Sequence, residues 1–301
     1  MITKLEDLLP LAQQKTVSKL SVACPYDAHT VEAVCRAQKE GLIIPVLVGN
    51  AKKIKAAIQK SAPELNDYEI IDIDNDETAV VEAVKIVSTG KADMLMKGLI
   101  SSEKYLKAIL SRHNGLLGNS AQITHVTVLQ NRNLEKLVVF GDSAIIPDPD
   151  FKQKMTILNA LASMSRILGV STPKVAMVAA TELVSHAINA GIDAAIISKM
   201  SDRGQIDCIV DGPISIDIAL NRETAEIKGI NGAIKGDADC LLFPNIEAGN
   251  AFYKSATKLG NSEIAGCLAG TKSPVAMTSR ADSAISKYYS ILIAKVAGTV
   301  I

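Results

Sequence analysis

Neither sign of charge is in excess in this chain, because 32 lysine and arginine residues balance 32 aspartate and glutamate residues. The charges are interspersed without long runs. The chain therefore lacks the polycationic face that nonspecific nucleic-acid binding requires, and we expect no nucleic-acid partner. A local basic pocket for a small anion is compatible with this composition.

Long apolar runs and paired cysteines are also missing. No apolar run approaches the roughly 18 residues of a membrane-spanning helix, and the charged segment Met1–Asp7 does not resemble a signal peptide. The cysteines have no C-x-x-C spacing and lie in apolar surroundings, which suits buried, reduced thiols: Cys24, Cys35, Cys208, Cys240 and Cys267. We expect a cytoplasmic protein that does not associate with membranes.

Several common catalytic motifs are absent. The sequence has no G-x-G-x-x-G after a strand, no G-x-x-x-x-G-K-[ST], no H-E-x-x-H and no G-x-S-x-G. These absences argue against common dinucleotide folds, P-loop hydrolysis, zincin proteolysis and α/β-hydrolase catalysis. The four histidines have no ligand spacing among themselves, so we expect no metal site.

The chain alternates short apolar runs with longer amphipathic segments, which predicts an α/β fold with mostly parallel sheets and right-handed crossovers. At 301 residues it is long enough for two domains. The expected strands are 20–24, 44–49, 69–73, 93–96, 174–179, 207–210 and 239–243. The expected helices are 27–40, 51–59, 77–88 and 151–168, the first of them capped by Asp27.

This alternation breaks between residues 123 and 140. Two β-rich runs, 123–129 and 137–140, flank a polar turn and predict an antiparallel pair. The rigid segment Pro147-Asp148-Pro149-Asp150 follows and marks the best domain boundary. Periodicity does not decide which domain takes the last strand and the helix that begins near Ala284.

Five turns carry polar residues just past expected strand ends, where a parallel sheet usually places its site. The turn Thr278–Ser283 is the most informative, because backbone N–H groups at a helix start there sit beside the guanidinium of Arg280 and could bind phosphate. The alternative is that Ser279 or Asp282 only caps a surface helix. The same alternative, a turn with a helix cap, applies to the other four turns: Met96–Ser102, Gly141–Pro147, Val210–Asp217 and Pro244–Asn250.

Four segments carry a family resemblance: Gly141-Asp142-x-Ala144-Ile145-x-Pro147-x-Pro149, Asp211-Gly212-Pro213, Phe243-Pro244-x-Ile246-Glu247-Ala248-Gly249-Asn250-x-x-Tyr253-Lys254 and Thr278-Ser279-Arg280-Ala281-Asp282-Ser283. In this order they resemble the phosphate acetyl- and butyryltransferases, over nearly the whole chain. The last segment and Met96-Lys97-Gly98-Leu99 are more similar to the butyryl branch.

The resemblance implies two α/β domains of the type found in isocitrate and isopropylmalate dehydrogenases. Domain I would comprise 1–147 and 270–301, and domain II 148–269. The active site would lie in the cleft between them, with Ser279 and Arg280 facing domain II. The family also implies a homo-oligomer, at least a dimer.

The implied reaction is the reversible conversion of acyl-CoA and inorganic phosphate into acyl phosphate and CoA, through a ternary complex without an acyl-enzyme. CoA would be a substrate, and no cofactor would be tightly bound. We assign the phosphate charge to Arg280 and oxyanion or phosphate binding to Ser279, with Lys97 as a second cation. Further substrate contacts are expected at Gly98, Ser101, Gly141, Asp142, Asp211, Gly212, Pro213, Asn250 and Ser286.

The chain departs from the family pattern at two places. Acetyltransferase members carry an aspartate seven residues after the serine that matches Ser279, and Ser286 stands there. Asp282 is the nearby carboxylate and a candidate base, although it could equally cap the helix, or no protein base could be needed. Many members also carry an arginine in the segment between Ser111 and Gln122, which is missing here after Gly115-Leu116.

Two other functions fit parts of the pattern. A metal-dependent β-hydroxyacid dehydrogenase of the same fold would need a carboxylate cluster, a divalent metal and a lysine–tyrosine pair. Tyr253 and Lys254 are adjacent and are expected to point apart on a helix. A binding module for CoA or acyl phosphate without turnover would explain the two departures.

Overall fold

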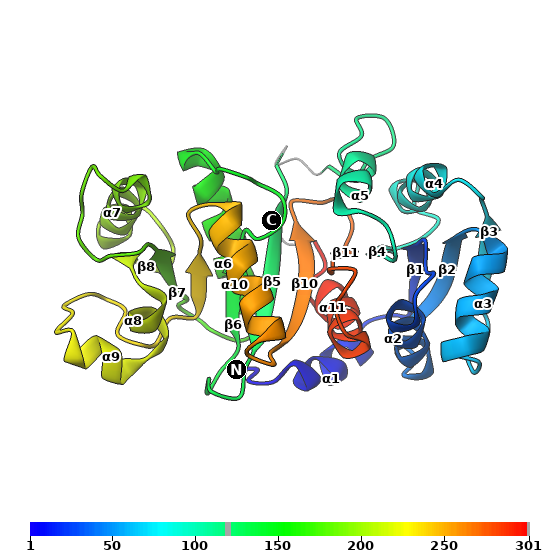
Figure 1. Ribbon diagram of the computed structural model, residues 1–301, viewed down its shortest axis with the longest axis horizontal. Coiled ribbons are helices and arrows are strands. Elements are labelled where there is room, and N and C mark those ends of the chain that lie inside the picture. The colour runs from blue at the N-terminus through cyan, green and yellow to red at the C-terminus, as the bar shows by residue number, and fades with distance from the viewer. Residues whose placement is uncertain (118–121, 300–301) are drawn as a thin grey trace. The chain divides into compact units, whose positions relative to one another are not determined.

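The computed structural model describes residues 1–117 and 122–299 as an α/β protein (Figure 1). Its backbone contacts divide the chain into two compact units. The described part of the first, here called the N-terminal unit, comprises residues 5–117, 122–123 and 264–299. The second, the central unit, comprises residues 1–4 and 124–263. These units differ from the predicted domains in where they place residues 1–4, 124–147 and 264–269. The predicted domain bounds stay a prediction.

The N-terminal unit has strand order β3-β2-β1-β4-β11-β10. Neighbouring strands are parallel except β10 and β11, which are antiparallel with Cys267 opposite Ala276. Its strands are β1 (Ser18–Ala23), β2 (Ile43–Gly49), β3 (Glu69–Asp72), β4 (Met94–Lys97), β10 (Glu263–Ala269) and β11 (Val275–Ala276). The prediction of a mostly parallel sheet is thus confirmed for this unit, but β10 was missed.

Capping side chains mark the starts of α2 and α5 in this unit. Asp27 accepts a hydrogen bond from the Thr30 N–H at 3.0 Å and starts α2, as expected, and Ser101 caps α5. The unit contains a 3₁₀ turn (Leu5–Asp7), α1 (Leu8–Gln13), α2 (Ala28–Lys39), α3 (Ala51–Ser61), α4 (Asp76–Ser88), α5 (Ser102–Ile109) and α11 (Ala284–Ala297).

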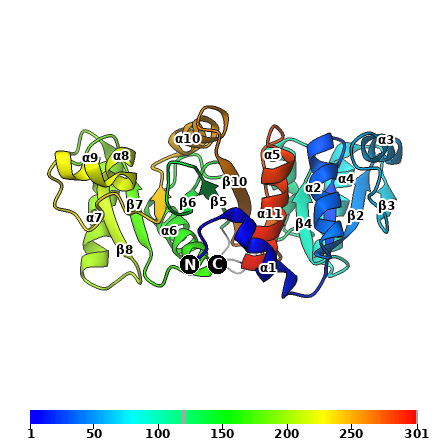
Figure 2. The same ribbon diagram turned by 90° about the horizontal axis from the view of Figure 1, so that it is seen from below.

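Strand pairing decides where the end of the chain belongs. β11 pairs in parallel with β4, Val275 opposite Leu95 and Ala276 opposite Met96. Helix α11 then packs against α2, and the two lie side by side in both views (Figures 1 and 2). The turn between β11 and α11 therefore lies at the carboxyl ends of the parallel strands, on the same side of the sheet as Lys97, the last residue of β4.

The central unit has strand order β5-β6-β9-β7-β8. The predicted antiparallel pair is confirmed, because Val128 of β5 lies opposite Val139 of β6, and the other neighbours are parallel. Its strands are β5 (Thr124–Gln130), β6 (Val138–Gly141), β7 (Lys174–Val178), β8 (Ile209–Ile214) and β9 (Cys240–Leu242).

Helices α6 and α10 lie on opposite faces of the central unit's strands (Figure 2). An Asp150–Gln153 capping box starts α6 directly after the proline-containing segment. The helices of this unit are α6 (Phe151–Ile167), α7 (Asn189–Asp202), α8 (Ile216–Leu220), α9 (Arg222–Ile227) and α10 (Ile246–Lys258).

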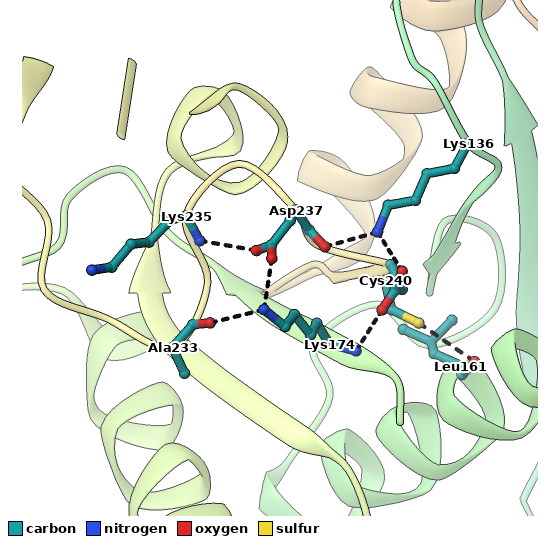
Figure 3. A network of polar contacts seen from close by, with 8 residues as sticks. Lys136, Leu161, Lys174, Ala233, Lys235, Asp237 and Cys240 are labelled. Atoms are coloured by element: carbon teal, nitrogen blue, oxygen red, sulfur yellow. Dashed lines mark hydrogen bonds and ion pairs between the residues drawn. The ribbon is translucent and has the colours of Figure 1, made fainter. Parts of the chain in front are cut away.

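A lysine–aspartate network joins the starts of β6, β7 and β9 (Figure 3). Lys136 pairs with the Asp239 carboxylate and donates to the Asp237 carbonyl at 2.8 Å. Lys174 donates its backbone N–H to Asp239 at 2.8 Å and pairs with the Asp237 carboxylate at 2.6 Å. The network fixes the amino ends of these strands, at the edge opposite the polar turns predicted to bind substrate.

All five cysteines are buried and free, as expected. Burial raises the pKa of the Cys24 and Cys208 thiols to about 11 and that of Cys267 to about 12. Among the described residues, no helix combines the length and apolar character needed to cross a membrane.

Candidate functional site

The turn Thr278–Ser283 is closed by two reciprocal hydrogen bonds. The Ser279 N–H donates to Asp282 Oδ2 at 2.7 Å, and the Asp282 N–H donates to the Ser279 carbonyl at 3.2 Å. The helix cap is Ser283, whose hydroxyl accepts from the Ser286 N–H at 3.2 Å. The interpretation of Ser279 or Asp282 as the cap is therefore wrong, because both residues shape the turn that precedes the helix.

Arg280 occupies the exposed tip of this turn. Its side chain is exposed and Ser279 beside it is half-buried. Within residues 1–117 and 122–299, no hydrogen bond or ion pair holds the Arg280 guanidinium. Its bidentate donors are thus available to a phosphate or carboxylate oxygen pair.

Lys287 supports the turn from behind, and the sequence analysis did not identify it. The residue is fully buried, and its ammonium donates to the Ser279 carbonyl at 3.3 Å. Burial lowers the pKa of Lys287, while Asp27 and Asp282 oppose that effect. A buried ammonium thus fixes the backbone of the residue before Arg280. The sequence signal is a lysine inside the long apolar segment from 284, which resembles an ordinary snorkelling lysine.

Lys97 places a second ammonium in the interior at the end of β4, where it is 1% exposed. Burial lowers its pKa to about 8, and the charges of Lys287 and Arg280 act in the same direction. Asp282 and Asp27 oppose the shift. The cluster therefore combines three cationic side chains with two carboxylates, and an added anion would stabilise it.

Both carboxylates of this cluster already accept hydrogen bonds. Asp27 accepts from the N–H and the hydroxyl of Thr30 at 3.0 and 2.6 Å, and Asp282 from the Ser279 N–H. The buried Thr278 hydroxyl, in contrast, has no hydrogen-bond partner among the residues that the structure describes. A buried unpaired hydroxyl next to Ser279 is a further polar group that a bound anion could satisfy.

Gly98 and Ser101 shape the turn that follows Lys97. The Gly98 N–H donates to the Ala23 carbonyl at 2.9 Å, and a Cβ at Gly98 would lie 2.6 Å from that oxygen. Only glycine permits this approach. The Ser101 hydroxyl accepts from the Lys104 N–H at 3.3 Å as the α5 cap. Both residues lie at the same edge of the sheet as the Thr278–Ser283 turn. Their contacts described here hold the backbone after β4 in place.

Ser286 also makes structural contacts. It is 4% exposed, its hydroxyl lies 3.2 Å from that of Ser283, and it accepts from the Ile264 N–H at 3.4 Å. The structure places it in the first turn of α11. It supplies no carboxylate where acetyltransferase members carry one.

In the central unit, Asp142 organises the turn after β6. Its Oδ1 accepts from the N–H groups of Ala144 and Ile145 at 2.8 and 2.9 Å. Its Oδ2 accepts from the Thr124 hydroxyl at 2.7 Å and the His125 N–H at 3.0 Å. With four donors and 2% exposure, the carboxylate fixes the turn, so its contacts indicate positioning rather than direct substrate binding.

Gly141 and Asn250 pack around the same turn. A Cβ at Gly141 would lie 2.6 Å from the His125 carbonyl oxygen. The Asn250 amide, on α10, donates to the Ser143 carbonyl at 3.0 Å. The structure thus brings Gly141, Asp142 and Asn250 together within the central unit.

Asp211, Gly212 and Pro213 lie inside β8 and not in a turn after it. That expectation was wrong because pairing with β7 continues past Asp211, with a register shift, to Ile214. Asp211 accepts from the Ile234 N–H at 2.9 Å. These residues share no described contact with the Asp142 turn.

The structure also bears on the alternative function as a metal-dependent dehydrogenase and on the missing arginine. Lys254 and Tyr253 do not point apart, because the Lys254 ammonium lies 4.4 Å from the centroid of the Tyr253 ring. No group of three histidine, cysteine, aspartate or glutamate residues within the described ranges could hold a metal ion. The segment that lacks the family arginine falls partly outside the described residues, which omit 118–121.

Comparison with known families gives a match over residues 75–295 to the model described as phosphate acetyl/butaryl transferase. A phosphate butyryltransferase of Clostridium acetobutylicum is 40% identical over 295 residues, which are 98% of each chain. A phosphate acetyltransferase of Thermotoga maritima is 38% identical, over 97% of this chain and 99% of the relative.

Among solved structures, a branched-chain phosphotransacylase from Enterococcus faecalis superposes with a TM-score of 0.79 at 28% identity. The match covers 92% of this chain and 98% of that one. A phosphotransacetylase from Streptococcus pyogenes, with a TM-score of 0.77 at 23% identity, has the same fold.

Proposed function

The chain belongs to the phosphate acetyl/butyryltransferase family and is an acyltransferase that moves an acyl group reversibly between CoA and phosphate; we propose that it acts on short acyl chains, butyryl or similar, at the Thr278–Ser283 turn. The observation that carries this proposal is the exposed Arg280 at the tip of a turn backed by the buried Lys97 and Lys287. The butyryl preference is supported by the relative that is 40% identical, a phosphate butyryltransferase.

In the direction of acyl-CoA synthesis, the CoA sulfur attacks the acyl carbon of the acyl phosphate. A C–S bond forms, the C–O bond to phosphate breaks, and phosphate leaves with both electrons of that bond. Arg280 binds the phosphate oxygens, and Ser279 with the Thr278 hydroxyl donates to the oxygen that gains charge. Lys97 and Lys287 add positive charge in a dry setting, where its effect is large.

The thiol proton has no dedicated acceptor in this assignment. Asp282 already binds the Ser279 N–H, and Ser286 carries no carboxylate. We infer that the proton of the CoA thiol passes to the departing phosphate or to water. Holding both substrates in position then supplies the main catalytic effect.

We further propose a ternary complex without an acyl-enzyme. All five cysteines are buried, and burial raises the thiol pKa of each one. A thiol with a raised pKa is a poor nucleophile near neutral pH. A cytoplasmic homo-oligomer, at least a dimer, completes the proposal on the strength of the family resemblance.

A thiol-release assay with butyryl-CoA and inorganic phosphate tests the proposal. We expect phosphate-dependent release of CoA, detected with a thiol reagent, and formation of butyryl phosphate. Acetyl-CoA, butyryl-CoA and a branched-chain acyl-CoA compared under the same conditions rank the acyl groups. Saturable CoA binding without thiol release would instead support the binding module.

A further inference from the structure

A cavity of about 500 Å³ opens in the N-terminal unit at the carboxyl ends of β1 and β4. This volume is in the range of small-molecule sites. Its walls come from the segment after β1, one face of α3, the start of α4 and the turn after β4: Tyr26, Lys53, Ala56, Ala57, Lys60, Asp76 and Leu99. None of the residues assigned to phosphate binding lines it.

Helix α3 supplies two cations to this cavity from one face. Lys53 and Lys60 are seven residues apart, with Ala56 and Ala57 between them, which is the spacing of a single helical face. Both lysines are exposed, and the small alanines leave the space between them open. Lys52 and Lys55 of the same helix do not line the cavity.

Tyr26 forms a rigid aromatic wall. Its hydroxyl accepts from the Asn50 N–H at 2.9 Å and donates to Asp76 Oδ1 at 3.0 Å. The Lys53 ammonium lies 5.0 Å from the ring centroid. Two lysines outnumber the single Asp76 carboxylate, so the cavity lining carries a net positive charge beside a fixed ring face. Such a lining suits an anion that carries an aromatic group.

The cavity extends to the turn that follows Lys97. Leu99, two residues after Lys97, lines it, and the Leu99 N–H donates to the Cys24 carbonyl at 2.8 Å. The cavity lining therefore comes within two residues of Lys97 along the chain. A long ligand could place one end in the cavity and the other at the cationic cluster.

We propose that this cavity binds the phosphorylated adenosine end of CoA, while the thiol end reaches the Thr278–Ser283 turn. The proposal rests on the proposed function and deepens it. CoA carries its phosphates and its base at the end remote from the thiol, which matches cations and an aromatic face set apart from the reacting groups. Contacts so far from the reacting atoms bind substrate and transition state alike, so they lower KM for CoA more than they raise kcat.

The test compares Lys53→Ala/Lys60→Ala with the matched control Lys52→Ala/Lys55→Ala. For each protein, kcat/KM is measured with CoA and with pantetheine, which has the same thiol end and no nucleotide. We expect the preference for CoA over pantetheine to fall at least about tenfold in Lys53→Ala/Lys60→Ala and to stay at the wild-type value in the control. A wild-type preference in the first variant, or an equal fall in both, would overturn the proposal.

Calorimetric titration with adenosine 3′,5′-bisphosphate tests the cavity without turnover. The wild-type protein should bind it, and Lys53→Ala/Lys60→Ala should bind it at least about tenfold more weakly than the control does. Absence of thiol release by the wild type would refute the proposed function. The titration would still decide whether the cavity binds the nucleotide. Equal affinity of both variants, or no binding to the wild type, would refute the nucleotide site.

Discussion

The Ser279 N–H donates to the Asp282 carboxylate at 2.7 Å, which ties the residue before Arg280 to the residue before the α11 cap. Asp282 is 3% exposed, so this bond is shielded from water. The contact supports a role for Asp282 in holding the turn, and it bears directly on whether Asp282 is the base.

The two roles of Asp282 predict different results for two substitutions. In Asp282→Asn, the amide oxygen can still accept from the Ser279 N–H, so we expect kcat to stay within about tenfold of wild type. In Asp282→Ala, the anchor is lost, and we expect a fall of about 10²-fold or more. Steady-state kinetics with butyryl-CoA and phosphate measures both. A general base would give similar, large losses in the two variants, and that result would contradict the anchoring role.

Arg280→Ala should lower turnover by about 10²-fold or more and raise KM for phosphate, because it removes the bidentate donor of the turn. The fold should survive, since Arg280 is exposed and its guanidinium has no bond within the described residues. Thermal unfolding checks the fold, and Arg203→Ala, an exposed arginine at the end of α7, is the matched control. Near-normal kinetics in Arg280→Ala would mean that phosphate binds elsewhere.

Phosphate affinity should weaken as pH rises through about 8, the pKa to which burial lowers Lys97. Below that pH the side chain is an ammonium and attracts phosphate, and above it the charge is lost. In Lys97→Arg the guanidinium keeps its charge, so the loss of affinity near pH 8 should be absent. Calorimetric titration of phosphate between pH 7 and 10 measures this, and identical profiles for both proteins would exclude Lys97 from the phosphate site.

Lys97→Met should stabilise the fold while lowering activity. The folded-state pKa of Lys97 is about 8, below its ordinary value of 10.5, so between these values the unfolded chain binds more protons and stability rises with pH. Below pH 8 the full cost of burying the charge is present. We expect Lys97→Met to raise the free energy of unfolding at pH 7 by on the order of 1–3 kcal/mol, with the gain shrinking toward pH 10.5. Denaturant unfolding at both pH values measures it, and a less stable variant at pH 7 would contradict the prediction.

Asp142→Asn should destabilise the protein by about 2–3 kcal/mol, because the amide nitrogen would meet donors that now point at a carboxylate oxygen. Asp148→Asn, an exposed residue of the next segment, is the control and should change stability by less than about 0.5 kcal/mol. Denaturant midpoints compare the two. Equal stability of both variants would show that the four contacts to Asp142 are not needed to hold its turn.

Local signals in the sequence predicted much of the fold. Asp27 starts α2 as its capping pattern indicates, and the runs at 44–49 and 151–168 form β2 and α6 within a few residues of the expected bounds. The strand β10 was missed: it contains Gly266 and small residues, and it pairs with a strand of only two residues. Both features weaken the local signal for a strand at these residues.

The sequence by itself determined the alternation of strands and helices, the family, and the Thr278–Ser283 turn that carries Arg280, because these follow from local pattern and motif. Tertiary structure alone decided which charges surround that turn. Lys97 and Lys287 are ordinary lysines in the sequence, and each becomes a buried cation only when β11 pairs with β4 and α11 packs against α2. Burial and charge proximity depend on which segments meet in space, and a linear pattern of residues does not contain that information.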